Sequence, residues 1–242
     1  AVVSEIPKEE EAGGEGPDSG LLGRWSFDEG QGVYSANAVD PTGDAELRHA
    51  SWAKGEFGTA LRLTGSDSYA ILPAMPQLDG SDEMSLAVWV YWEGTGQYPN
   101  ILTGGTWSPG GFLIFVRDRT CSFRMGRPGH RHGAADEAWT EASAPFLSEL
   151  PLKQWVHLAA VFKRPQITTY VNGKQVGSAR WDYPVGQNGD LQVGRWAGSA
   201  SHAGLIDELR IYRRALEAEE VLALANPAGR LPDDYPDLGP AK

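Results

Sequence analysis

Cysteine is nearly absent from the sequence, and long apolar runs are absent altogether. The single cysteine, Cys121, excludes a disulfide within the chain. It lies in "RTCSFRMG", a pattern typical of a strand, so we expect a buried and inert thiol. No segment approaches the roughly 20 apolar residues that a membrane helix needs, so membrane insertion is not expected. No secretory signal peptide is recognisable, and the chain begins with "AVVSEIP" rather than methionine. This start favours a mature, processed protein that is secreted, periplasmic or held at the cell surface; the alternative is a fragment excised from a larger protein.

Positive charge and catalytic motifs are also scarce. The chain has 21 Lys and Arg against 32 Asp and Glu, a formal net charge of −11. Such a charge argues against nucleic acid and anionic membranes as partners. The sequence contains no nucleophile elbow, Cys–His signature, phosphate-binding loop or dinucleotide fingerprint. These absences predict a protein that is not an enzyme.

The chain does contain many short strand patterns separated by Gly, Pro and Asp turns. Hydrophobic residues make up 41% of the sequence, and nine are tryptophan, so a substantial core is expected. The strongest hairpin signal is Asn172-Gly173. One short helix is expected over 215–225, ended by Pro227. Expected strands cover 23–28, 60–64, 69–73, 84–92, 100–105, 111–117, 121–126, 155–163, 166–172, 174–180, 191–196 and 205–212. This pattern predicts an all-β antiparallel sandwich.

The two ends differ in composition from the rest. Residues 1–20 are rich in Glu, Gly and Pro, and residues 227–242 contain four prolines. Such segments bury too little apolar surface to offset the entropy of ordering them. We therefore expect one folded domain over 21–226, flanked by two tails that offer contacts for a larger assembly.

Several segments in this order resemble the laminin-G-like, concanavalin A-type jelly-roll domains of bacterial surface and secreted proteins. The resemblance covers residues 21–225. It implies a two-sheet antiparallel jelly roll with six or seven strands per sheet, one sheet being concave. It also implies sugar binding or protein adhesion, and one structural calcium ion. The segments that carry it are "GRWSFDEGQG", "GEFGTALRLTGSDSYAIL", "MSLAVWVYW", "KQWVHLAAVFK", "TTYVNGKQVG", "LQVGRW" and "GLIDELRIYRRALEAEEV".

An acidic residue interrupts the last strand pattern. In "LIDELRIYRR", strict alternation places Leu205, Asp207, Leu209 and Ile211 on one apolar face. A carboxylate directed into a core is costly unless it is paired, hydrogen-bonded or bound to a metal. We therefore expect Asp207 to have a specific partner.

The resemblance implies that this partner is calcium. Carried over by position, the ligand set is Asp207, Asp28, the carbonyl region of Gly65, and Asp67. Carboxylate and carbonyl oxygens are the ligands that calcium prefers, and the ion would hold the first and last strands together. The alternative is that Asp207 binds backbone amides or Arg62 and that no metal is present.

Aromatic and arginine side chains at strand ends and in loops are candidates for sugar binding. Aromatic faces stack on sugar rings, and polar groups bind the hydroxyls. The candidate ligand-binding residues are Trp107, Trp196, Trp139, Tyr98, Arg117 and Arg124. Trp92 and Trp181 lie in comparable positions. The alternative is that these tryptophans pack over the ends of the sandwich.

The segment 125–151 is longer and more polar than the resemblance leads us to expect. It contains His130 and His132, which could meet one metal ion if the segment is extended. Asp136 and Glu137 are the only other potential metal ligands nearby. The alternative is that the segment is a solvated loop.

Paired catalytic carboxylates are missing. Glycoside hydrolases of this broad fold place two acids on one strand face. Here Asp207 and Glu208 are adjacent, so alternation directs them to opposite faces. Two functions remain: a calcium-stabilised carbohydrate-binding module, or a structural and adhesive subunit that binds a partner protein.

Overall fold

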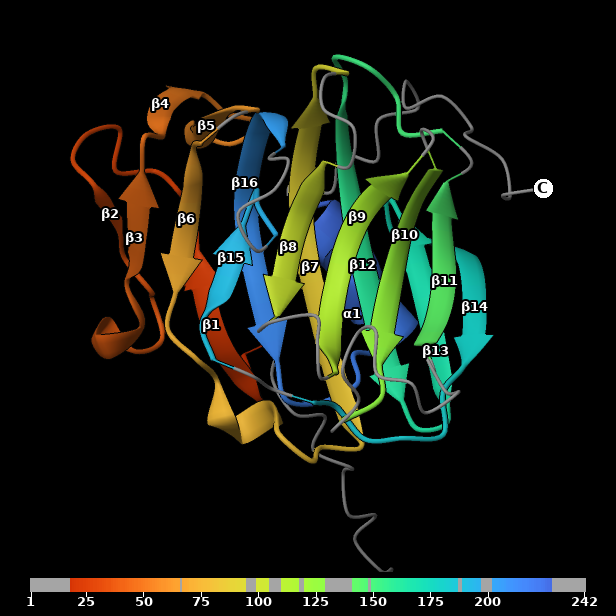
Figure 1. Cartoon of the computed structure of the whole chain (residues 1–242). Helices are drawn as coiled ribbons and strands as arrows, with labels where there is room; N and C mark the ends of the chain where they lie inside the picture. Colours follow the sequence, from red (N-terminus) through yellow and green to blue (C-terminus); the bar gives the residue numbers. More distant parts are fainter. Residues whose placement is uncertain are drawn as a thin grey trace, which may run out of the picture.

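The computed structural model describes residues 18–65, 67–94, 99–104, 110–117, 120–128, 141–147, 149–186, 189–196 and 202–227. Two antiparallel sheets pack face to face, and one short helix lies behind them (Figure 1). This confirms the predicted all-β jelly-roll sandwich. The sheet nearer the viewer in Figure 1 is called the front sheet, and the other the back sheet.

Within the described residues, each sheet has eight strands rather than six or seven. In spatial order the back sheet contains β14 (Lys174–Arg180), β13 (Gln166–Val171), β12 (Trp155–Lys163), β7 (Glu83–Trp92), β16 (Ala203–Tyr212), β5 (Thr59–Thr64) and β4 (Ser51–Lys54), with β1 (Leu21–Trp25) paired to β16. The front sheet contains β11 (Glu141–Leu147), β10 (Thr120–Gly126), β9 (Gly111–Arg117), β8 (Asn100–Gly104), β15 (Leu191–Val193), β6 (Tyr69–Leu72), β3 (Ala45–Arg48) and β2 (Tyr34–Ser35). The helices are η1 (Pro41–Gly43), η2 (Pro76–Leu78) and α1 (Ala218–Ala225).

The central strand β7 is apolar on both sides, as its sequence predicts. Leu86, Val88 and Val90 face the core between the sheets. Ala87 faces outward, where it packs with residues of β12, β13 and β16 against the α1 region. The helix therefore covers one part of the outer face of the back sheet.

Two local predictions are confirmed. Asn172 and Gly173 both have positive φ, 49° and 78°, and form the turn between β13 and β14. Cys121 is 0% exposed, and burial raises the pKa of its thiol. No helix in the described ranges has the length and apolar character needed to cross a membrane.

The predicted alternation of the last strand is wrong at Asp207. The pairing of β16 with β7 shifts by one residue between Asp207 and Arg210, and Glu208 has φ 47°. This β-bulge reverses the phase of the strand. Ile206 faces the core before the bulge and Leu209 after it. Asp207 is 0% exposed, but it lies on the outer face of the back sheet.

Candidate functional site

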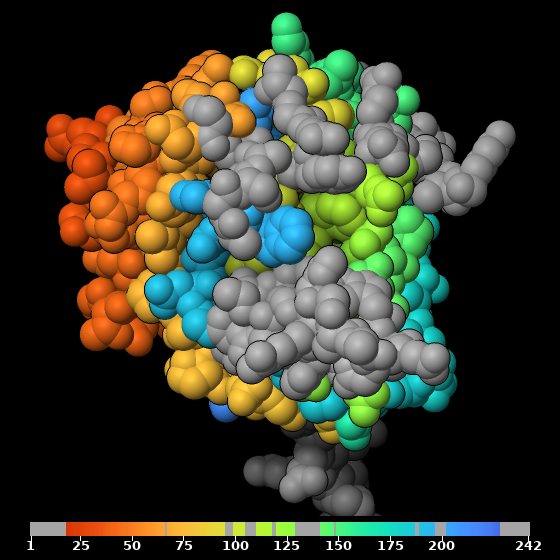
Figure 2. Space-filling model, in the orientation of Figure 1, coloured from red at the N-terminus to blue at the C-terminus, as the bar shows by residue number. Residues whose placement is uncertain are grey.

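The outer face of the front sheet has an apolar centre. Strand β9 alternates, so Phe112 and Ile114 enter the core while Leu113 and Phe115 point outward. The outward pair is 5% and 8% exposed, and the partly buried Trp196 packs against it. Figure 2 looks onto this face, with the red and orange N-terminal part of the chain at its left and green segments at its right.

Arg124 of β10 lies directly beside this apolar centre. Its guanidinium carbon is 4.2 Å from the centre of the Phe115 ring. Its Nη1 donates to the Glu141 carboxylate at 2.8 Å. The Nε atom is buried without a hydrogen-bond partner. Burial lowers the pKa of Arg124, Glu141 opposes this change, and the charge of Arg117 adds to it.

Other polar groups border the same face. Arg117 ends β9 two residues after Phe115, so it lies on the same side of the strand, and it is exposed. Gln192 pairs with Thr103, and its buried Oε1 has no hydrogen-bond partner. We call the group formed by Leu113, Phe115, Trp196, Arg117 and Arg124 the Trp196 surface. It combines an apolar floor with two charged groups, and the Gln192 amide lies on the same sheet face.

The predicted sugar-binding residues divide into two groups. The structure brings Trp196, Arg117 and Arg124 together, whereas Tyr98, Trp107 and Trp139 lie outside the described residues, as do His130 and His132. Trp92 and Trp181 belong to the core, at 5% and 2% exposure.

Sequence reasoning missed Leu113 and Phe115. Both faces of "GFLIFVR" are apolar, so alternation alone could not show which residues point outward.

The structure brings together only two of the four predicted calcium ligands, Asp28 and Asp207. Asp207 Oδ2 accepts a hydrogen bond from Phe57 N at 3.1 Å. Asp28 Oδ1 accepts one from Thr59 N at 2.9 Å. The two carboxylates, from widely separated parts of the chain, therefore bind the same loop, residues 55–59. Arg62 is not the partner of Asp207, because its guanidinium bonds Glu93.

The two carboxylate oxygens of Asp207 differ. Oδ2 accepts from Phe57 N, whereas Oδ1 is buried without a hydrogen-bond partner. Burial raises the pKa of this carboxyl to about 7, the Phe57 N–H opposes the rise, and the charges of Glu208 and Asp28 add to it. The loop lies so close that a Cβ on Gly55 would be 2.6 Å from Asp207 Oδ2.

Gly65 and Asp67 lie at the other end of β5. The strand runs from Thr59 to Thr64, which separates its ends by roughly 17 Å at about 3.3 Å per residue. Asp67 Oδ2 instead lies 3.0 Å from His49 Nδ1. The structure thus brings Asp28 and Asp207 together and does not add Gly65 or Asp67 to them. Across the described ranges, no three His, Cys, Asp or Glu side chains gather closely enough to hold a metal ion.

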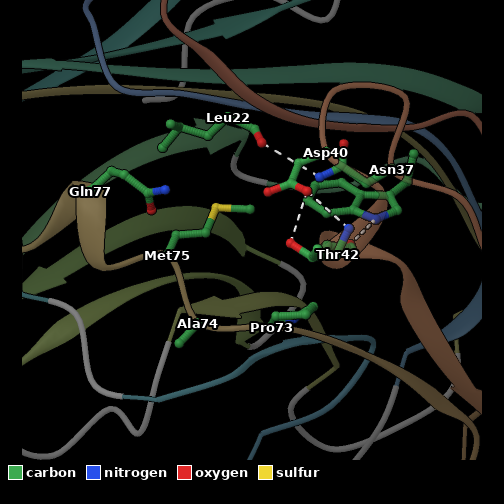
Figure 3. Close-up of a pocket in the computed structure, with 10 residues that line it drawn as sticks. Leu22, Asn37, Asp40, Thr42, Pro73, Ala74, Met75 and Gln77 are labelled. Carbon is green, nitrogen blue, oxygen red and sulfur yellow. Dashed lines mark hydrogen bonds between the residues drawn. The ribbon is translucent and has the colours of Figure 1, made fainter.

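A small polar cavity of about 70 Å³ lies between β1, η1 and the segment before η2 (Figure 3). Asp40 caps η1 there by accepting hydrogen bonds from Thr42 N and Oγ1. Trp25 Nε1 donates to Gly43 O at 3.0 Å. These polar groups already hydrogen-bond one another, so we assign the cavity a structural role and no ligand.

The sheet order and the face-to-face packing define a concanavalin A-type jelly-roll domain. The chain belongs to the concanavalin A-like lectin/glucanases superfamily, whose sequence model matches residues 64–222. No curated protein matches the chain in sequence.

Solved structures share the fold at low identity. Domain 4 of AbnA, an extracellular GH43 arabinanase from Geobacillus stearothermophilus solved with arabinotriose, is 23% identical with a TM-score of 0.67, covering 85% of this chain and 98% of that one. The binding domain of Paraclostridial Mosquitocidal Protein 1 is 14% identical with a TM-score of 0.69, covering 87% and 53%. The binding domain of Botulinum Neurotoxin DC, in complex with SialylT, is 11% identical with a TM-score of 0.65, covering 87% and 52%. The chain thus spans about half the length of these toxin domains.

Proposed function

We propose that this domain is a non-catalytic carbohydrate-binding module of a secreted or surface protein, with the Trp196 surface as its binding site. The carrying observation is the packing of the partly buried Trp196 on Leu113 and Phe115 beside the Arg124–Glu141 ion pair. An aromatic ring offers a sugar its apolar face, and the flanking groups offer hydrogen bonds to hydroxyls. A domain of similar fold was solved with arabinotriose, which makes arabino-oligosaccharides the first ligands to test.

Partial exposure supports a binding role for the ion pair beside the tryptophan. The Arg124 and Glu141 side chains are 22% and 21% exposed, so a ligand hydroxyl could hydrogen-bond the guanidinium or the carboxylate. Gln192, on the same sheet face, is also partly exposed.

We further propose that calcium stabilises the domain at the loop 55–59. Asp207 and Asp28 would supply carboxylate oxygens, and backbone carbonyls of the loop would supply the rest. The buried Oδ1 of Asp207 without a partner, and the convergence of both acids on one loop, support this fit. When bound, calcium supplies positive charge that offsets the burial of these acids. It would lock the loop to β16 and would have no catalytic role.

The test is binding of neutral and sialylated oligosaccharides, arabinotriose first, to the full chain by isothermal titration calorimetry. We expect Trp196→Ala to weaken binding about tenfold, which corresponds to roughly 1.4 kcal/mol. The matched control is Tyr34→Ala, which removes an aromatic side chain that is 57% exposed on β2 at the far edge of the sheet. Equal binding by wild type and Trp196→Ala would show that the site lies elsewhere.

A protein partner is the second candidate function. A toxin binding domain of similar fold was solved in complex with rat synaptotagmin II. Wild-type protein that binds no saccharide, yet forms a stable complex lost in Trp196→Ala, would favour this function.

A further inference from the structure

The outer face of the back sheet is covered by α1 over only part of its area. Ala87 and Ala159 pack in the cluster that Leu216 and Val221 cover. Two pairs further along, beyond Trp89 on β7, the outward residue is Tyr91. Its register partner on β12 is Trp155.

Tyr91 and Trp155 form an aromatic pair at the surface. Their ring centroids are 5.5 Å apart and the planes are tilted by 56°. Both side chains are partly exposed. The two rings therefore present an angled apolar platform to solvent.

Buried rings hold this platform in place. Trp89 and His157, the next outward pair along the same two strands, are 2% and 1% exposed and have ring centroids 5.4 Å apart. Phe57, from the loop 55–59, packs edge-on against Trp89 at 5.6 Å. An ordered platform loses little entropy when a ligand binds.

Polar groups lie on the other side of Tyr91. Leu205 of β16 is its register partner there, and Arg62 of β5 is the next residue across. Two hydrogen bonds, of 2.7 and 2.9 Å, join the Arg62 guanidinium to the Glu93 carboxylate. The two side chains are 36% and 27% exposed. The pair offers donors and acceptors but carries no net charge.

We propose that Tyr91, Trp155, Arg62 and Glu93 form a second saccharide-binding surface, on the opposite face of the sandwich from the Trp196 surface. The ligand class is a neutral oligosaccharide, because the aromatic platform stands beside a charge-compensated ion pair. A platform two rings wide matches one or two sugar units. It is small beside the ~800 Å² per partner that a stable protein interface buries.

The test is a titration of the ¹⁵N-labelled full chain with neutral oligosaccharides, followed through the tryptophan indole N–H signals. Arabinotriose, xylotriose, cellotriose and mannotriose are the probes. The signal missing from Trp155→Phe identifies the Trp155 indole, and Trp196→Phe identifies that of Trp196. We expect at least one probe to shift the Trp155 signal saturably in Trp196→Ala. We also expect Tyr91→Ala to weaken this binding about tenfold.

The two proposed surfaces can fail separately. A Trp155 signal unmoved by every probe overturns the second surface, whatever the Trp196 signal does. A Trp196 signal that moves alone leaves the Trp196 surface intact. Trp155→Ala also tests another occupant, a second copy of this chain. If wild type self-associates and this variant is monomeric by light scattering, the face is an interface and the saccharide surface is overturned.

Discussion

The carboxylate of Asp207 accepts a hydrogen bond from the backbone N–H of Phe57 at 3.1 Å, although the two residues are 150 positions apart. Phe57 packs against Trp89, and Trp89 is the register partner of Asp207. A hydrogen bond, a ring contact and a strand pairing thus connect the same three residues. The loop 55–59 is therefore held in place by the last strand of the sandwich.

Calcium is expected to raise the melting temperature of wild type, and EDTA to lower it. A ligand at 100 times its Kd stabilises the native state by about 2.7 kcal/mol. Asp207→Asn keeps an acceptor for Phe57 N but removes the negative charge, so it should lose the response to calcium. Scanning calorimetry with and without calcium measures this. Asp67→Asn is the control and should respond like wild type. An Asp207→Asn variant with the full calcium shift would contradict the site.

Gly58→Ala is expected to destabilise the protein by roughly 1–3 kcal/mol more than Gly80→Ala. Both glycines have positive φ, 57° and 72°, so backbone strain is similar in the two variants. Only at Gly58 would the new Cβ collide with the Asp28 carboxylate, while at Gly80 it would meet nothing within 4 Å. Urea unfolding measures the difference. Equal losses would mean that Asp28 does not hold the loop.

Stability is expected to fall as pH drops below about 6.5, because two histidines are buried. Burial lowers the pKa of His157 to about 3 and of His202 to about 4. The unfolded chain therefore binds more protons than the native one between these values and 6.5. Each histidine contributes a loss of about 1.4 kcal/mol per pH unit within its window.

The difference between wild type and His202→Gln isolates this effect. Subtraction cancels the carboxyl groups, including Asp207, whose raised pKa acts in the opposite direction. A glutamine can still donate to the Tyr91 carbonyl, which His202 Nε2 meets at 3.2 Å. Urea unfolding between pH 4.5 and 7.5 should give a shallower dependence for the variant. Parallel curves would show that His202 is not buried in its neutral form.

Cys121 is expected to react with a thiol reagent only when the protein unfolds. The side chain is 0% exposed, and burial raises the pKa of its thiol, so little thiolate is accessible in the native state. Labelling rates in increasing urea should follow the unfolding transition. Rapid labelling without denaturant would contradict the placement of β10.

Sequence patterns predicted the strands whose signals are local. The limits of β9, β12 and β14 agree with the expected 111–117, 155–163 and 174–180. The Asn172-Gly173 turn was equally clear, since both residues tolerate positive φ. In contrast, β11 lies within the polar segment 125–151, where "EASAPFL" shows little β propensity. Its hydrogen-bonded pairing with β10, rather than its own β propensity, holds it in the sheet.

The bulge in β16 could not be predicted in the same way. Nothing local favours a glutamate with φ 47°. The conformation of Glu208 is held by ion pairs to Arg24 at 3.2 Å and to Arg210 at 2.8 Å. Arg24 comes from the first strand, 184 positions away. The prediction that Asp207 has a specific partner followed from its position in an apolar strand, but strict alternation placed its side chain on the wrong face of the sheet.

One inserted residue thus reverses, partway along a ten-residue strand, which alternate side chains face the core. Up to Asp207 its odd-numbered positions face outward, and from Leu209 they face inward. Deleting Glu208 would restore strict alternation along the whole strand, with one of two consequences. Either the Asp207 carboxylate would enter the aliphatic interior, or Leu209 and Ile211 would leave it. We infer that this strand tolerates conservative substitutions more readily than a change of one residue in its length.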